Sequence, residues 1–309
     1  MQVLEQYKHI FEFKGRYIFL LSGAGTGKSY VMAQRIIADM LTMENCFWLC
    51  TRKHHTDVGR SVFLQVKDVI WETGLQKYFN INKSDRTISS KINNSKVQFT
   101  GVDDPNKIKS IAEVTHVFME EADEMSEDDF DILDSRCRSK NTHFNQLVLA
   151  FNPPEKTHWI PVRWFKTGTI MPEYNEPLKW SENINNTNLE YLALRTHYHH
   201  NPYLPQDSKA KYESFEKHNY AFYERYCLGT WLTSMAGTFF DAQHIKYGTQ
   251  LGRNIIYLDP AYSMVAGEGD YTCILKTSYI NNKFHINNCT LKQNMIPNEV
   301  LDNLLCITF

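Results

Sequence analysis

The chain has 309 residues, a length that suggests one large or two ordinary domains. With 42% hydrophobic and 22% charged residues, it has the composition of a folded globular protein, which excludes a largely disordered chain. The formal net charge of −2 implies that any contact with nucleic acid comes from local basic patches. The seven cysteines form no C-x-x-C pair, nothing at the amino terminus resembles a signal peptide, and no apolar run approaches the roughly 18 residues of a membrane helix. We therefore expect a cytosolic protein with free thiols and no membrane contact.

Residues 1 to 16 are expected to form a helix or a strand that leads into the fold. Gln2, Glu5 and Gln6 are candidates for contact with an adenine base. The alternative is a solvated amino-terminal segment without a ligand.

The first informative motif runs from Tyr17 to Leu41. The apolar run YIFLL, the glycine-rich SGAGTGKS and the helical pattern YVMAQRIIADML predict a buried strand, a phosphate-binding loop and an amphipathic helix. Gly23, Gly25 and Gly27 are expected to take positive φ, so that backbone N–H groups point at a polyphosphate. The first glycine of the G-x-x-x-x-G-K-[ST] pattern is replaced by Ser22, and a glycine-rich turn without a ligand is the alternative.

The side chains of this loop suggest how a nucleotide is held. Lys28 is expected to reach the β- and γ-phosphates, and the Ser29 hydroxyl to ligate Mg²⁺ at the start of a helix whose dipole also favours anions. The expected nucleotide-binding residues of the loop are Ser22, Gly23, Ala24, Gly25, Thr26, Gly27, Lys28 and Ser29.

The next elements continue an α/β pattern. Residues 46 to 55, CFWLCTRKHH, predict a second buried strand, with Arg52 at its carboxyl end, the edge where open α/β sheets bind ligands. Arg52 is expected to contact a phosphate or DNA, and an exposed surface charge is the alternative. A helix is predicted for residues 56–73 and a hairpin for residues 77–102. The NKSD run at 82–85 has the form of the guanine-reading motif of GTPases. That motif should follow the strand that carries the Mg²⁺-linked carboxylate, and here it precedes the strand that ends in Glu120, so we treat the match as chance.

A pair of carboxylates follows the next apolar strand. Residues 114–119 predict a buried strand that ends in Glu120 and Glu121. Downstream of a phosphate-binding loop, such a pair fits phosphate hydrolysis, because one carboxylate holds the Mg²⁺ shell and the next polarises the attacking water. Solvated loop charges are the alternative. Further acids, from Asp123 onward, are expected to solvate or cap the next helix, with Ser126 as its N-cap.

A third strand, QLVLAFNPP at 146–154, ends in Asn152. The Asn152 side chain is expected to hydrogen-bond a γ-phosphate or its water, with a plain turn residue as the alternative. Further along, His197, His199 and His200 suggest a metal site, but no cysteine or other partner lies at zinc-ligand spacing, so a polar linker surface is favoured.

The strand ends SGAGTGKS, VFMEEADE and LAFNPP resemble, in order and spacing, those of the large terminase subunit of tailed phages, in its PBSX-type branch. GVDDPNKIKSI, LDSRCRS, THYHHNPYLP and YERYCLGTW add to the resemblance. It implies an α/β fold: a P-loop NTPase domain of ASCE or RecA-like type with a mostly parallel sheet over residues 1–195. A helical linker over 196–234 and a partial RNase H-like nuclease domain over 235–309 would follow.

The resemblance also implies roles for single residues. Lys28 and Ser29 would bind ATP phosphates and Mg²⁺, Glu120 would take the metal-binding position and Glu121 that of the catalytic glutamate. Asn152 falls in the motif that couples hydrolysis to DNA movement. Many relatives have arginine where this chain has Ala24, so a catalytic arginine is expected from elsewhere. Its candidates are Arg52, Arg136, Arg138 or a residue of a neighbouring subunit.

In the last part of the chain, NIIYLDPAYS at 254–263 predicts a buried strand that ends in Asp259. By resemblance, Asp259 matches the first acid of an RNase H-like nuclease, where carboxylates hold two Mg²⁺ or Mn²⁺ ions, and Asp270 is a second candidate. The chain ends at Phe309 within a further apolar run, LLCITF. We therefore expect the nuclease domain to be truncated and to cleave DNA poorly or not at all.

The family resemblance implies a motor that packages viral DNA with energy from ATP. Its expected partners are double-stranded DNA, a portal protein, a small terminase subunit and further copies of the chain in a ring, in the cytoplasm of the infected or lysogenic bacterial host. Two alternatives stay open: a stand-alone helicase- or kinase-like ATPase, and a scaffold that binds nucleotide without hydrolysing it.

Overall fold

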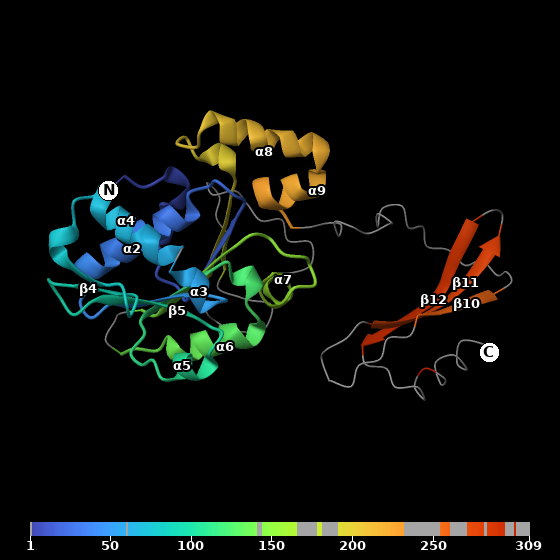
Figure 1. Ribbon diagram of the computed structural model, residues 1–309, viewed down its shortest axis with the longest axis horizontal. Helices are drawn as coiled ribbons and strands as arrows, with labels where there is room; N and C mark the ends of the chain where they lie inside the picture. Colours follow the sequence, from blue (N-terminus) through green and yellow to red (C-terminus); the bar gives the residue numbers. More distant parts are fainter. Residues whose placement is uncertain are drawn as a thin grey trace. The chain divides into compact units, whose positions relative to one another are not determined.

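The computed structural model describes residues 2–59, 61–140, 144–165, 178–180, 191–231, 254–259, 271–280, 283–293 and 300. The chain divides into two compact units, Met1–Phe239 and Phe240–Phe309, each of which can be followed in Figure 1.

The first unit is built on a nine-stranded sheet with the order β3-β4-β5-β2-β6-β7-β1-β9-β8 among the described residues. Its strands are β1 (Tyr17–Ser22), β2 (Phe47–Arg52), β3 (Phe79–Asn82), β4 (Thr87–Ser90), β5 (Lys96–Gly101), β6 (His116–Glu120), β7 (Gln146–Phe151), β8 (Leu178–Trp180) and β9 (Tyr191–Thr196). The six strands from β5 to β9 in this order are mutually parallel. At the edges, β4 and β8 run antiparallel to them, and β3 pairs antiparallel with β4.

Strand β7 lies between β1, which precedes the glycine-rich loop, and β6, which ends in the acidic pair. An additional strand in this place is the arrangement that defines the ASCE class of P-loop folds. The predicted α/β class and mostly parallel sheet are therefore confirmed.

Helices were predicted after the glycine-rich loop, over residues 56–73, after Ser126 and in the linker at 196–234. The helices among the described residues are α1 (His9–Glu12), α2 (Lys28–Thr42), α3 (His55–Val58), α4 (Val62–Glu72), α5 (Pro105–Lys109), α6 (Glu127–Arg136), α7 (Trp159–Trp164), α8 (Gln206–His218) and α9 (Tyr220–Phe222). Single turns are η1 (Glu5–Tyr7), η2 (Gln76–Tyr78), η3 (Ala122–Glu124), η4 (Tyr198–His200) and the π-helical turn η5 (Tyr223–Cys227). Helix α6 begins with the predicted capping box, in which Ser126 and Asp129 bond each other's backbone amides.

Alternating side chains of each central strand face opposite sides of the sheet, because successive residues of a strand point to opposite faces. In β1, Ile18 and Leu20 pack with α2 and α4, whereas Phe19 and Leu21 pack with α5, α6 and α7. Figure 1 shows α2 and α4 on one side of the sheet and α5 and α6 on the other. Two apolar cores therefore hold the sheet rigidly in the middle of a three-layer unit.

The predicted hairpin of residues 77–102 forms β3, β4 and β5. Its first turn contains the NKSD run, where the Asn82 side chain donates a hydrogen bond to Asp85 at 2.7 Å. This turn belongs to the edge of the sheet that is far from β1 in strand order.

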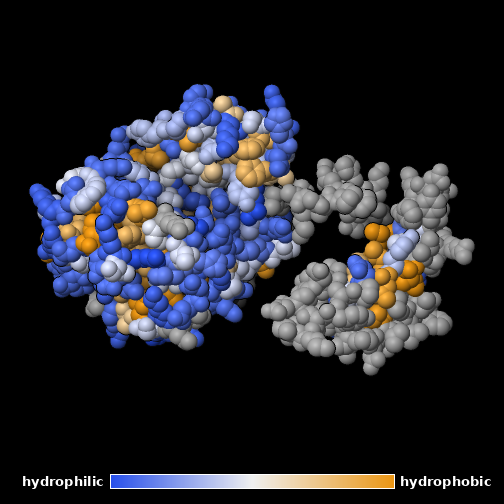
Figure 2. All heavy atoms as spheres, in the orientation of Figure 1, coloured by the Kyte–Doolittle hydropathy of each residue, from blue (hydrophilic) through white to orange (hydrophobic). Residues whose placement is uncertain are grey.

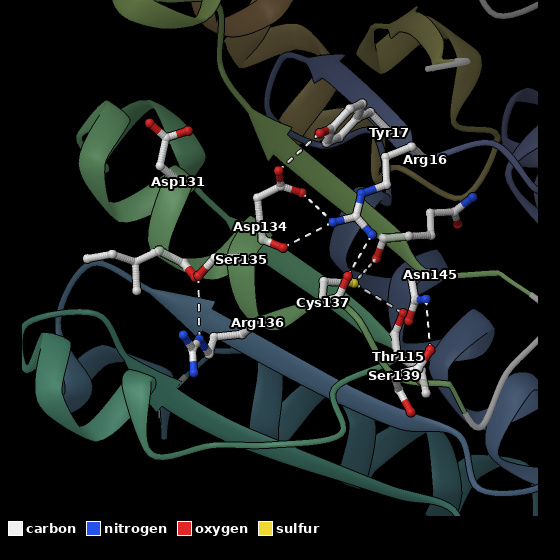
Figure 3. Close-up of polar contacts among 12 residues, drawn as sticks. Arg16, Tyr17, Thr115, Asp131, Asp134, Ser135, Arg136, Cys137, Ser139 and Asn145 are labelled. Carbon is white, nitrogen blue, oxygen red and sulfur yellow. Dashed lines mark hydrogen bonds and ion pairs between the residues drawn. The ribbon is translucent and has the colours of Figure 1, made fainter. Parts of the chain in front are cut away.

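Figure 3 shows the polar contacts that fasten α6 to the amino-terminal edge of the sheet. Arg16, just before β1, donates to the Asp134 carboxylate at 2.5 Å and to the Cys137 carbonyl at 2.7 Å. The Tyr17 hydroxyl donates to the same carboxylate at 3.1 Å. Helix α6 begins shortly after Glu120, Glu121 and η3, and these contacts hold its carboxyl-terminal end.

The second unit contains a three-stranded antiparallel sheet among its described residues, formed by β10 (Asn254–Asp259), β11 (Tyr271–Ile280) and β12 (Lys283–Gln293). Ile274 is fully buried and packs with Val300. The first of these strands, β10, was predicted from the sequence and ends at Asp259 as expected. The apolar run LLCITF lies outside the described residues.

Among the described residues, no helix is both long enough and apolar enough to cross a membrane. Figure 2 shows that hydrophilic side chains cover most of the visible face of the first unit, and that apolar side chains gather in a few smaller areas.

We expect Asp134→Ala to lower the free energy of unfolding of the first unit by about 2 kcal/mol, because it removes the carboxylate that pairs with the partly buried Arg16 and accepts the hydrogen bond of the Tyr17 hydroxyl. Asp131→Ala, on the same helix, is the matched control. Asp131 is 54% exposed and pairs with Arg163, so its loss should cost less than about 1 kcal/mol. Urea unfolding followed by tryptophan fluorescence measures both, and equal losses would contradict this account of the edge.

Candidate functional site

The polar residues predicted to form a site lie at one edge of the sheet. Ser22 ends β1, Arg52 ends β2, Glu120 ends β6, and Asn152 follows β7 directly. Because these strands are parallel and adjacent, their carboxyl ends meet at the same edge, which is where ligands bind in open α/β sheets. The structure therefore brings these four strand-end residues to one edge of the sheet.

The glycine-rich loop joins β1 to α2. Gly25 has φ +72° and Gly27 has φ +81°, the left-handed conformation that glycine takes without strain. Gly23 was predicted to share it, and this is wrong, because its φ is not positive. Gly23 is required for space instead: a Cβ there would lie 2.5 Å from the carbonyl oxygens of Tyr226 and Cys227.

The end of the loop is joined to the acidic strand by a hydrogen bond. The Ser29 hydroxyl, in the first turn of α2, donates to Glu120 Oε1 at 2.9 Å. The Glu120 side chain is 7% exposed, and its Oε2 is buried without a hydrogen-bond partner. A hydroxyl and a carboxylate at this spacing fit Mg²⁺, which takes oxygen ligands and is usually held by one or two carboxylates together with phosphates.

Glu121 lies in a left-handed backbone conformation, with φ +52° and ψ +52°. Such a conformation costs a non-glycine residue about 1 kcal/mol or more and is common at functional positions. Glu121 is the residue at which the chain passes from β6 into η3. The Glu121 side chain is 38% exposed, whereas that of Glu120 is buried.

Arg52 is the counter-ion of this acidic turn. Its guanidinium forms an ion pair with Glu121 and lies 3.8 Å from Glu120 and 3.7 Å from Glu124. The side chain is only 15% exposed, so the alternative of an exposed surface charge is wrong. In this arrangement Arg52 neutralises the carboxylate that was predicted to polarise water.

Asp123 is a member of the site that the sequence analysis missed, because it was expected to be solvated. Its side chain is 11% exposed, and burial raises the pKa of its carboxyl. The charges of Lys28 and Arg225 and the backbone N–H of Asn152 oppose this rise. Burial in turn lowers the pKa of Lys28 to about 8, opposed by Asp123 and Glu120. Lys28 is therefore a buried amine whose charge is supported by two carboxylates, and its charged form would also be stabilised by a phosphate.

The segment after β9 contacts the glycine-rich loop directly. The Ala24 amide donates to the Tyr226 carbonyl at 2.5 Å, and the Asn201 side chain donates to the Gly25 carbonyl at 2.8 Å. Arg225 lies 3.6 Å from Asp123. The sequence predicted a linker here, and no local pattern indicates contacts between residues some 200 positions apart.

A cavity of about 470 Å³ lies beside the loop. It is lined by Gln2, Val3, Leu4, Glu5, Gln6, His199, His200, Pro202 and Tyr203. Gln6 is 2% exposed and donates from Nε2 to the Thr26 carbonyl at 3.2 Å, so the alternative of a solvated amino-terminal segment is wrong for this residue.

The described residues contain no cluster of three or more histidine, cysteine or acidic side chains that suits a metal ion.

Two of the three candidate catalytic arginines lie elsewhere. Cys137 forms an isolated backbone β-bridge with Val114, which lies just before β6 at the amino-terminal edge of the sheet. Arg136 and Arg138 flank Cys137, and Arg136 donates to the Lys109 carbonyl at 3.0 Å. They therefore lie at the opposite edge from Glu121 and do not join its site within one chain.

The predicted nuclease residues belong to the second unit. Asp259 is the last residue of β10, is exposed, and pairs in register with Cys273 of β11. Asp270 lies outside the described residues. The proposed metal site of this unit therefore stays a prediction.

The strand order, the glycine-rich loop and the Ser29–Glu120 pair define an α/β fold of the P-loop NTPase type. The sequence profile described as "Phage terminase large subunit" matches residues 14–230, and the chain belongs to this family. This confirms the resemblance seen in the strand-end motifs.

One relative is the PBSX phage terminase large subunit of Bacillus subtilis (strain 168), which is 28% identical over 163 residues. That match covers 51% of this chain and 36% of the relative. The large terminase of a thermophilic bacteriophage (crystal form 2) has a TM-score of 0.57 at 17% identity, covering 98% of this chain and 71% of that one. The large terminase of bacteriophage HK97 has a TM-score of 0.53 at 11% identity, and the match covers 93% of this chain and 62% of that one. At these identities the structural likeness shows the fold.

We expect Gly23→Ala to lower the free energy of unfolding by about 1–3 kcal/mol, because the new Cβ would meet two backbone carbonyls that cannot rotate away. It should also increase hydrogen exchange at the Ala24 amide. In the control Gly74→Ala, which has φ +69° and no neighbour within 4 Å, only local strain of about 1 kcal/mol is expected. Unchanged exchange at Ala24 in Gly23→Ala would contradict the close packing described above.

Proposed function

We propose that the first unit binds and hydrolyses ATP, and that the chain is a motor subunit that packages viral double-stranded DNA into a procapsid. The observation that carries the proposal is the 2.9 Å contact between Ser29 and Glu120 at the edge that also holds Lys28 and Glu121. Two solved complexes of a related fold support it, because the large terminase of the thermophilic bacteriophage has been solved with ADP, with a TM-score of 0.57, and with ATP-gamma-S, with a TM-score of 0.55.

Each residue of the edge has a role in this proposal. Backbone amides of the loop and the Lys28 ammonium would bind the phosphates, because N–H donors of a glycine-rich loop and a cation at the start of a helix favour an anion. Ser29 and Glu120 would hold Mg²⁺, which neutralises phosphate charge in the transition state. Glu121 orients a water molecule for in-line attack and accepts its proton, which requires its release from Arg52.

The adenine base of the nucleotide is proposed to occupy the cavity between the amino-terminal segment and residues 199–203. Its volume of about 470 Å³ lies within the range of small-molecule sites. Gln6 ties this cavity to the loop through the Thr26 carbonyl. The cavity includes Gln2, Glu5 and Gln6, the three residues proposed from the sequence.

Asn152 is proposed to pass the state of the phosphate to the DNA-binding surface, because it lies directly after β7, between the loop strand and the acidic strand. DNA contacts should come from Lys and Arg side chains on backbone phosphates, with weak sequence preference and strong salt dependence. A portal protein, a small terminase subunit and further copies in a ring are the proposed partners, in the cytoplasm of the bacterial host.

The remaining assignments extend the proposal to the rest of the chain. The ATPase domain is placed at 1–195, the linker at 196–234 and a nuclease domain at 235–309. In the nuclease domain, Asp259 and Asp270 are proposed to contribute to a Mg²⁺ or Mn²⁺ site that cleaves DNA. The antiparallel pairing of β10, β11 and β12, with Asp259 at a strand end, supports this assignment.

We expect Glu121→Gln to lower the rate of ATP hydrolysis by at least about a hundredfold while nucleotide binding persists, because the change removes the proton acceptor but keeps the shape. Glu124→Gln is the matched control, since Glu124 lies in the same turn, is 51% exposed and also faces Arg52. It should change the rate by less than about threefold. The assay is steady-state phosphate release with Mg²⁺, with and without linear duplex DNA.

Equal rates in wild type and Glu121→Gln would contradict the proposed catalytic role. Stimulation of wild-type hydrolysis by duplex DNA is expected of a motor, and its absence would favour a kinase-like enzyme. Nucleotide binding without hydrolysis in any of these conditions would favour a scaffold.

We also expect the affinity for Mg·ATP-gamma-S to fall by roughly fivefold to tenfold between pH 7.5 and pH 9. Lys28 binds phosphate as a cation, and with its pKa lowered to about 8 the charged fraction declines over this interval. Lys28→Met should bind more weakly and lose the pH dependence. Titration of a fluorescent analogue at several pH values measures both, and a flat wild-type profile would contradict the assignment.

A further inference from the structure

Arg225 lies in η5, on the segment that contacts the glycine-rich loop. Its Nη2 atom is 3.6 Å from Asp123 Oδ2, which is longer than a hydrogen bond, although the two side chains are only 25% and 11% exposed. The two charges therefore attract each other without a direct hydrogen bond between them.

Both members of the pair have unused hydrogen-bonding capacity. Arg225 Nε and Asp123 Oδ1 are each buried without a hydrogen-bond partner. Buried polar groups are rarely left unpaired, and such groups in a native fold call for an explanation such as a ligand. The Arg225 guanidinium also lies 4.8 Å from the centre of the Tyr226 ring, a contact that helps to hold the planar guanidinium in place. Its N–H donors could then bind a second anion.

The position of this guanidinium is fixed relative to the loop. The next residue, Tyr226, accepts the hydrogen bond of the Ala24 amide at 2.5 Å, so Arg225 is one peptide unit from the loop backbone. Asp123 interacts with both Lys28 and Arg225, so one carboxylate is shared by a loop cation and a cation of the η5 segment.

We propose that Arg225 binds the terminal phosphate of a nucleoside triphosphate in the same chain, exchanging Asp123 for the phosphate, and so reports the presence of that phosphate to residues 223–230. This inference rests on the proposed ATPase function. It supplies a cationic group in a chain that has alanine at position 24 and an Arg52 already paired with Glu121. A diphosphate, which lacks the terminal group, would leave Arg225 on Asp123.

The test compares the binding of ATP-gamma-S and ADP, each with Mg²⁺, to the full chain. Arg225→Ala should weaken ATP-gamma-S binding by about tenfold to a hundredfold, the range for a charge-assisted contact, and ADP binding by less than about twofold. Arg225→Lys should restore part of the difference. Lys217→Ala removes one positive charge from an exposed position in the last turn of the neighbouring α8 and should change neither affinity.

A second variant separates phosphate binding from a merely structural ion pair. If Arg225 acted only by holding Asp123, Asp123→Asn and Arg225→Ala would weaken both nucleotides alike, and this result would overturn the inference. The inference expects Asp123→Asn to keep the preference for the triphosphate over the diphosphate. Equal losses for both nucleotides in Arg225→Ala would also overturn it while leaving the ATPase proposal intact. Failure of the wild-type chain to bind either nucleotide would overturn both.

Discussion

The hydrogen bond between Ser29 and Glu120 is the contact on which the site depends. It joins the first turn of α2 to the end of β6, two positions 91 residues apart in the sequence. Strand β7 lies between the two strands concerned, so the contact forms only if β1, β7 and β6 are parallel and end at one edge. The two apolar cores on either side of the sheet supply that rigidity.

Charge balance is the second constraint at this edge. The cations Lys28, Arg52 and Arg225 face carboxylates that follow one another in the turn after β6. Phosphate groups are anionic, so their binding has to compete with these carboxylates for the same cations. If the proposed nucleotide site is correct, binding is coupled to the positions of the acidic turn and of residues 223–230, and this coupling would give a nucleotide a physical means of moving the chain.

The sequence predicted the elements whose signal is local. The YIFLL run, the loop-to-helix junction, the acidic strand end and the helix cap at Ser126 are all short patterns, and each forms as expected. It did not predict the burial of Asp123 or its approach to Arg225, because both depend on packing between residues 102 positions apart. Gly23 illustrates the same limit, since its neighbours Tyr226 and Cys227, rather than its own φ, explain why glycine is needed there.

A crystal structure of the chain with Mg²⁺ and ATP-gamma-S would test the proposed site. We predict a metal ion about 2.1 Å from the Ser29 hydroxyl oxygen, with Glu120 in its coordination sphere directly or through water, and the phosphates against Lys28 and the loop amides. A nucleotide bound elsewhere, or one bound at the loop with its metal ion remote from both Ser29 and Glu120, would contradict it.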